Sequence, residues 1–136
     1  MANPNIVAVT TINGRSMGYG LSTSNSIMVP PENAFAATGV PTGHVYKINS
    51  ITVSNVSTGT TAHVSVWRSS GGVAGPYGTS SLSGYIAYQI DIPPKATISI
   101  LGKSTSIYLN ESHKIAASTN VALGTLQFSC SYEDIS

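Results

Sequence analysis

Hydrophobic and small polar residues alternate with period two along much of this chain. In the clearest run, 125–132, the apolar positions are Leu126, Phe128, Cys130 and Tyr132. Successive residues of a β-strand point to opposite faces, so this run has one apolar face and one polar face. The pattern predicts a half-buried antiparallel strand with that apolar row directed into a core.

Three further runs alternate in the same way and predict strands with one inward row each. The inward rows are Ala62, Val64 and Val66; Ile86, Tyr88, Ile90 and Ile92; and Ile98 and Ile100. His63 and Trp67 have the opposite parity to the first row, so both belong to the outer face of that strand, and we expect the His63 side chain to be exposed.

Segment 45–55 is also predicted to be a strand, but its phase breaks in the middle. Tyr46 and Ile48 share one parity, whereas Ile51 and Val53 have the other. A β-bulge near Asn49-Ser50 would restore a single inward face. A strand that crosses between two sheets would have the same effect, and the sequence leaves both alternatives open.

Shorter strands are predicted over 6–12, 16–21, 25–29, 106–109 and 113–118. Asn13-Gly14 between the first two is the best two-residue hairpin turn. Strands then recur roughly every 8–14 residues, the spacing of a sandwich or jelly roll. We therefore expect an all-β chain in which residues 1–136 form one antiparallel β-sandwich, jelly-roll or immunoglobulin-like, of about eight to ten strands.

Two long loops are predicted near 30–43 and 69–84. The second is rich in glycine and serine and holds Tyr77 and Leu82. Long loops in compact domains are often functional or mobile, and a plain crossover is the other interpretation.

Charge is scarce: 8% of the 136 residues are charged, whereas about 25% is typical. One interpretation is a soluble protein with a Ser/Thr-rich surface, and the other is a subunit covered by neighbours, because interfaces are depleted in Lys, Glu and Asp. The net charge of +1 gives no basic stripe for nucleic acid. No apolar stretch approaches the roughly 18 residues of a membrane span.

The only cysteine is Cys130, so no internal disulfide can form and no oxidising compartment is required. Its place in an apolar row predicts a buried free thiol that acts as a small hydrophobe. The opening residues lack a basic region followed by an apolar run, so we expect no secretory signal.

Candidate chemistry is sparse. The only adjacent carboxylates, Glu133 and Asp134, would point to opposite faces and are expected to lie in a solvated tail. His44, His63 and His113 lack the spacing of metal ligands. We therefore expect no catalytic residues, no metal and no cofactor.

Aromatic and apolar side chains in or beside the second loop are the most interesting candidates. They are Trp67, Tyr77, Leu82 and Tyr85. Such residues can anchor a protein interface or stack on a sugar ring, and a loop that folds back over them as a small satellite core is the third alternative.

Several segments resemble small virion structural proteins of tailed bacteriophages, marine phages in particular. They are the opening MANPNIV, residues 46–56 (YKINSITVSNV), 91–97 (DIPPKAT), 106–112 (SIYLNES) and 129–135 (SCSYEDI). The resemblance implies a non-enzymatic virion protein, assembled in the host cytoplasm, that packs against major capsid, tail or neck proteins. It favours an outer capsid decoration subunit that forms homo-oligomers, with a trimer as one arrangement.

Two alternatives stay open beside the decoration subunit. One is a neck, tail or fibre-attachment subunit. The other is a carbohydrate or host-receptor binding module, in which Trp67, Tyr77 and Tyr85 would form the platform.

Overall fold

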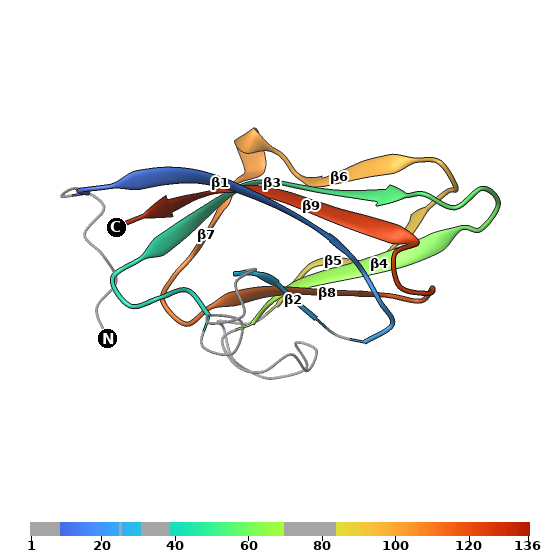
Figure 1. Ribbon diagram of the computed structural model, residues 1–136, viewed down its shortest axis with the longest axis horizontal. Coiled ribbons are helices and arrows are strands. Elements are labelled where there is room, and N and C mark those ends of the chain that lie inside the picture. Colours follow the sequence, from blue (N-terminus) through green and yellow to red (C-terminus); the bar gives the residue numbers. More distant parts are fainter. Residues whose placement is uncertain (1–8, 25, 31–38, 70–83) are drawn as a thin grey trace.

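The computed structural model describes residues 9–24, 26–30, 39–69 and 84–136, and in this part of the chain two antiparallel sheets pack face to face (Figure 1). The expected all-β sandwich is confirmed. Among these residues no helix is long and apolar enough to cross a membrane.

The strands divide into two sheets. The first sheet contains, in spatial order, β1 (Ile12–Gly20), β9 (Leu126–Ile135), β3 (Val45–Asn55) and β6 (Thr97–Leu101), with β7 (Ile107–Leu109) also paired to β3. A short 3-10 turn, η2 (Lys103–Thr105), separates β6 from β7. The second sheet contains β2 (Ser26–Val29), β8 (Lys114–Thr119), β4 (Ala62–Ser69) and β5 (Gly84–Ile92).

The strand pairs are nested. β1 pairs with β9, β2 with β8, β3 with β6 and β7, and β4 with β5. Since β6 and β7 both lie along β3, they act as two halves of one strand interrupted at η2. The chain is thus a long antiparallel hairpin wound into two sheets, which is the topology of a jelly roll and not of an immunoglobulin domain.

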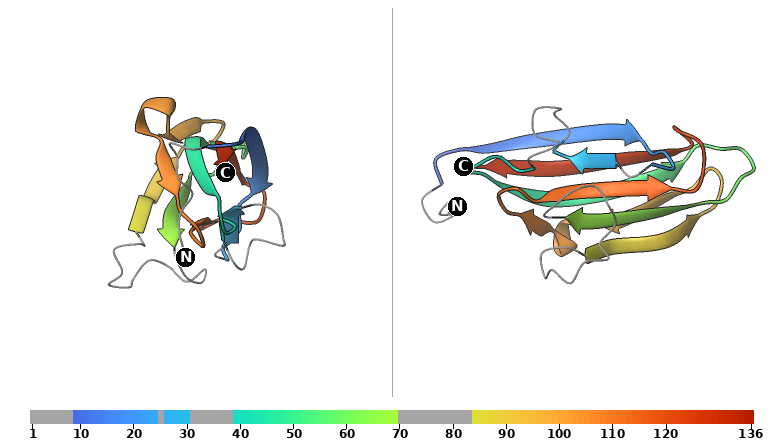
Figure 2. Two further views of the ribbon diagram at one scale, coloured as in Figure 1. Left: turned by 90° about the vertical axis from the view of Figure 1, so that its left-hand side faces the viewer. Right: turned by 90° about the horizontal axis from the view of Figure 1, so that it is seen from below.

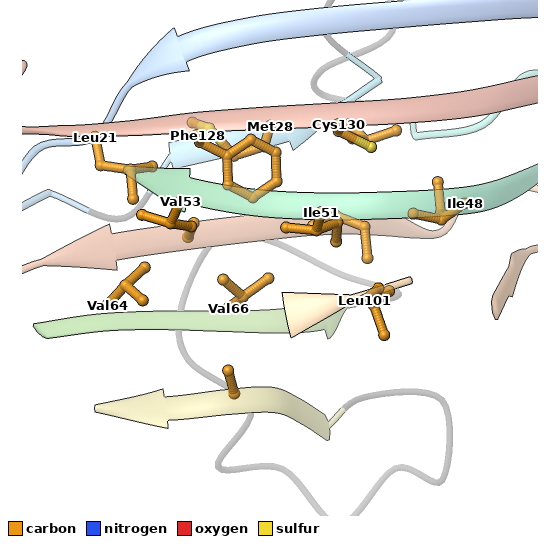
Figure 3. Packing of buried hydrophobic residues seen from close by; sticks show 14 of the residues in the cluster. Leu21, Met28, Ile48, Ile51, Val53, Val64, Val66, Leu101, Phe128 and Cys130 are labelled. Atoms are coloured by element: carbon orange, nitrogen blue, oxygen red, sulfur yellow. The ribbon is translucent and has the colours of Figure 1, made fainter. Parts of the chain in front are cut away.

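The core fills the space between the sheets. The predicted inward row of β9 is confirmed, because Leu126, Phe128, Cys130 and Tyr132 are all buried. Figure 3 shows Phe128 and the neighbouring aliphatic side chains of the first sheet facing Val64 of the second. The predicted inward row of β4 is likewise buried.

The phase break in β3 is a β-bulge. Its pairing with β9 shifts between Ile48 and Ser50, so Asn49 is the extra residue. Residues on both sides of the bulge, such as Ile48 and Ile51, therefore reach the same core. The alternative of a strand that crosses between sheets is wrong, because β3 stays beside β9 along its whole length.

The predicted hairpin at Asn13-Gly14 is wrong. Both residues lie inside β1, opposite Asp134 and Glu133 of β9. Because β9 offers a continuous partner, the chain stays extended where the local sequence favours a turn. Residues 6–8 of the predicted strand 6–12 lie outside the described residues, and β1 begins only at Ile12.

The predicted inward row of β5 is confirmed at its ends and wrong in the middle. Ile92 is buried and Ile86 packs partly buried against the core, whereas Tyr88 is 55% exposed and Ile90 is 41% exposed. Ala87, which has the other parity, is buried. Two register shifts against β4, together with a positive φ of 46° at Gln89, break the alternation. In β6, Ile98 and Ile100 are partly buried and pack against the core as expected.

The two predicted long loops are described only at their ends, since 31–38 and 70–83 lie outside the described residues. At the end of the first loop, Gly39 has a φ of +80°, and a Cβ there would collide with the backbone of Ser112. Only glycine fits this close approach. Val40 then exchanges backbone hydrogen bonds with Ser112 and His113, which anchors the loop end beside β8.

Candidate interface on strands β4 and β5

Trp67 is buried, so it is not the exposed aromatic side chain that a protein interface or a sugar platform would need. Only 2% of its surface is accessible. It does lie on the face opposite the main core, as its parity predicts, but β4 is flanked by β8 and β5. Its ring meets the edge of Tyr85, the residue directly opposite in the ladder, at a centroid distance of 6.0 Å. Tyr85 therefore covers part of the indole on this outer face.

Tyr85 and Tyr88 continue this cluster towards solvent. Their ring centroids are 4.7 Å apart at an interplanar angle of 67°, an edge-to-face pair. Tyr85 is 37% exposed and Tyr88 is 55% exposed. We call Trp67, Tyr85 and Tyr88 the β5 aromatic patch. Tyr77 and Leu82, the other two candidates, lie outside the described residues.

Tyr88 is the member of the patch that the sequence pattern assigned to the core. The bulge around Gln89 turns its ring to the outer face, beside Tyr85. No local sequence signal marks this bulge, because the alternation of apolar residues continues through it. Only the position of β5 at the edge of its sheet favours such a bulge, and that position is known from the strand order, not from the sequence.

A small cleft opens beside the patch. It has a volume of about 180 Å³ and is lined by Arg68 of β4, residues 84–86 of β5 and Ile107 of β7. These residues come from both sheets, so the cleft lies at the open side of the sandwich. Small-molecule sites usually measure about 300–1,000 Å³, so this cleft suits a single side chain or part of a sugar ring.

The patch contains a buried donor, Nε1 of Trp67. Among the residues that the structure describes, it has no hydrogen-bond partner. Leaving a buried donor unpaired costs about 1–3 kcal/mol.

The electrostatics near the cleft are mildly positive. Arg68 lines the cleft, and its partner in the ladder is Ile115 of β8. His113 and Lys114 directly precede Ile115 in the sequence. Burial lowers the pKa of His113 below its ordinary value, and the positive charge of Arg68 lowers it further. His113 is therefore neutral at physiological pH, and the guanidinium is the charge that a ligand in the cleft would meet.

A second polar cluster ties together β1, β9 and the chain before β3. Asp134 is buried, its Oδ1 accepts from Nδ1 of His44 at 2.6 Å, and its Oδ2 forms an ion pair with Nε of Arg15 at 3.4 Å. The residue before His44, Gly43, donates its backbone N–H to Oε1 of Glu111 at 2.8 Å. The expected solvated tail is wrong for Asp134, because β1 and His44 flank the end of β9. This arrangement crosslinks three segments and serves the fold.

Cys130 is a buried free thiol, as expected. Burial raises its pKa to about 12, so the thiol stays protonated and is a poor nucleophile. In the ranges that the structure describes, no group of three or more His, Cys, Asp or Glu residues could hold a metal ion.

No protein-family model matches the chain, and neither the curated proteins nor the solved structures give a match.

Proposed function

We propose that this chain is a non-enzymatic structural subunit of a bacteriophage particle, an outer capsid decoration subunit that packs on other virion proteins. The observation that carries the proposal is the exposed apolar surface of β5. Tyr85, Tyr88 and Ile90 face solvent on a protein in which only 8% of residues are charged. Aromatic enrichment and charge depletion are the compositional marks of a protein interface.

Two further arguments support this proposal. Jelly rolls are a recurrent architecture of viral capsid proteins, although a fold alone does not fix a function. The resemblance of segments such as 46–56 and 129–135 to small phage virion proteins supplies the kind of assembly. Both segments form strands of the first sheet, β3 and β9, so the resemblance falls on the framework that would carry an interface.

Location in purified particles tests the proposal. We expect mass spectrometry to detect the chain in phage particles from a culture that expresses its gene, and cryo-electron microscopy to place it on the outer capsid shell. Density on the tail or neck alone would replace the decoration role by a tail or neck role. Absence of the chain from purified particles would overturn the proposal.

A binding assay tests the surface itself. We expect the recombinant chain to bind particles that lack it, and the double substitution Tyr85→Ala/Tyr88→Ala to abolish most of this binding. Tyr108→Ala is the matched control, because Tyr108 is 46% exposed on β7 of the other sheet. Equal loss with the control variant would show that the β5 aromatic patch is not the contact.

A carbohydrate-binding module is the second candidate, and the cleft favours it. Tyr85 lies at the cleft and offers an aromatic face, while Arg68 offers hydrogen-bond donors. Glycan-array binding that disappears in Tyr85→Ala would favour this candidate. Trp67 is unsuitable as a stacking platform because it is buried, so the substitution of Trp67 would test folding instead.

A further inference from the structure

β1 has a free edge that is long and regular. It is the outermost strand of the first sheet and lies along the margin of the sandwich (Figure 2). Its nine residues pair with β9 without any register shift. No other strand in the described part of the chain pairs with β1. Its outer row of N–H and C=O groups is therefore available to another strand.

The other sheet margins are blunted in the ways that natural proteins use against edge-to-edge pairing. β5 carries two register shifts against its neighbour. β2 has four residues and a register shift of its own. β6 and β7 have five and three residues. Among these strands, β1 alone is both long and paired without a register shift.

Charge does not protect β1 either. Its only charged residue is Arg15, and the Nε of Arg15 lies 3.4 Å from the buried carboxylate of Asp134 in the same sheet. An exposed Lys or Arg on an edge strand normally disfavours pairing, but this charge is largely compensated within the chain.

The direction of the free hydrogen-bonding groups follows from the backbone. Thr11 and Ser136 donate to each other's carbonyl groups, and the N–H of Leu21 donates to Leu126. In an antiparallel ladder such bonded pairs alternate with non-bonded ones. Odd-numbered residues of β1 therefore bond to β9, and even-numbered residues direct their N–H and C=O groups to the free edge.

We propose that two copies of this chain pair through β1, antiparallel, about a two-fold axis at Ser16. This register places Gly14 opposite Gly18 and Ile12 opposite Gly20 of the second copy. It joins even-numbered residues with even-numbered residues, as the free hydrogen-bonding groups require, and it uses the full length of the strand. The two first sheets become one continuous sheet.

The charge of Arg15 favours this register over the one centred on Arg15 itself. In a pairing centred on Arg15, two guanidinium groups would lie directly opposite each other, which destabilises a strand pair. With the axis at Ser16, Arg15 faces Met17 of the second copy. The strand is thus complementary to itself, as a two-fold interface demands.

The test adds like charges across the proposed axis. Gly14 and Gly18 both tolerate a side chain, since an added Cβ meets nothing within 4 Å at Gly14 and only the Phe128 carbonyl oxygen, at 3.8 Å, at Gly18. In Gly14→Lys/Gly18→Lys the new ammonium groups of the two copies face each other. We expect sedimentation equilibrium to show the wild type moving from 14.0 kDa to twice that mass as concentration rises. The double variant should dimerise at least about tenfold more weakly.

Controls separate this effect from added charge alone. Gly59→Lys/Gly102→Lys adds the same charge where a new Cβ also meets nothing within 4 Å, and it should dimerise like the wild type. Mixing Gly14→Lys/Gly18→Lys with Gly14→Glu/Gly18→Glu should restore dimers. An unchanged melting temperature of each variant at concentrations where the chain is monomeric excludes misfolding.

Three outcomes would overturn the pairing. They are a wild type that stays monomeric up to about millimolar concentration, a dimer that the β1 substitutions leave unchanged, and a trimer. The inference does not rest on the proposed function. Particle location and two-fold pairing are measured separately, and either can fail alone.

Discussion

Strands β9 and β5 occupy opposite situations in the sandwich. β9 lies between β1 and β3, with regular pairing to β1 over its whole length. β5 lies at the edge of the second sheet, and among the strands that the structure describes it pairs only with β4. Both strands carry alternating apolar residues. In β9 every member of the row is buried, whereas in β5 Tyr88 and Ile90 are exposed.

The difference shows what fixes the register of a strand. A slip in β9 would turn its whole apolar row out of the core and break two ladders at once. A bulge in β5 disturbs only its ladder with β4, so its cost in free energy is small. An edge strand can therefore turn aromatic rings outward, and that freedom produces the surface on which the proposed function rests.

Protection of Cys130 should give the largest effect. Alkylation needs a thiolate, and the pKa of this buried thiol is raised to about 12, so reaction requires β9 to open. We expect the native protein to react more than about a thousandfold more slowly than the protein unfolded in urea, at the same pH. The measurement is mass spectrometry of timed iodoacetamide reactions. Similar rates in the two states would mean that the inward row of β9 is not closed.

Phe128→Ala should remove about 3–5 kcal/mol from the free energy of unfolding. Phe128 is 1% exposed at the centre of the core, so the substitution loses apolar burial and leaves a cavity. Urea denaturation followed by Trp67 fluorescence measures the loss. A loss below about 1 kcal/mol would contradict the packing shown for β9.

The strands with two neighbours were the predictable ones. In β9 the alternation alone was sufficient, and in β3 the phase break located the bulge at Asn49 within one residue. Both strands lie in the middle of the first sheet, where pairing on two sides enforces the pattern that the sequence displays.

Features that depend on distant neighbours were not predictable. The parity of Trp67 placed it on the outer face, but parity does not say that Tyr85 packs against it there. The position of Asp134 near the end of the sequence suggested solvent, yet β1 and His44 enclose it. The bulges of β5 arise from its pairing with β4 and have no counterpart in its own alternation.

Gln89→Gly should stabilise the protein by about 1 kcal/mol. Gln89 has a φ of 46°, a conformation that costs a side chain roughly that much and glycine nothing. Gln127→Gly in β9 is the matched control, and it should destabilise by a similar amount, since that residue is extended and its side chain donates to the Gly124 carbonyl at 2.6 Å. Urea denaturation of both variants measures the two changes. Destabilisation by both substitutions would argue against the bulge.

Tyr88→Ala should have the smallest effect on stability, about 0.5 kcal/mol. Tyr88 is more than half exposed, and its substitution removes the edge-to-face contact with Tyr85 at 4.7 Å. Denaturation curves compared with those of Phe128→Ala give the contrast between an outward and an inward aromatic residue. If Tyr88→Ala costs as much as Phe128→Ala, then Tyr88 lies in a core, as its sequence parity suggests, and β5 has no exposed patch. A small loss of stability combined with a large loss of particle binding would instead separate the two strands by role, with β9 holding the fold and β5 presenting a surface.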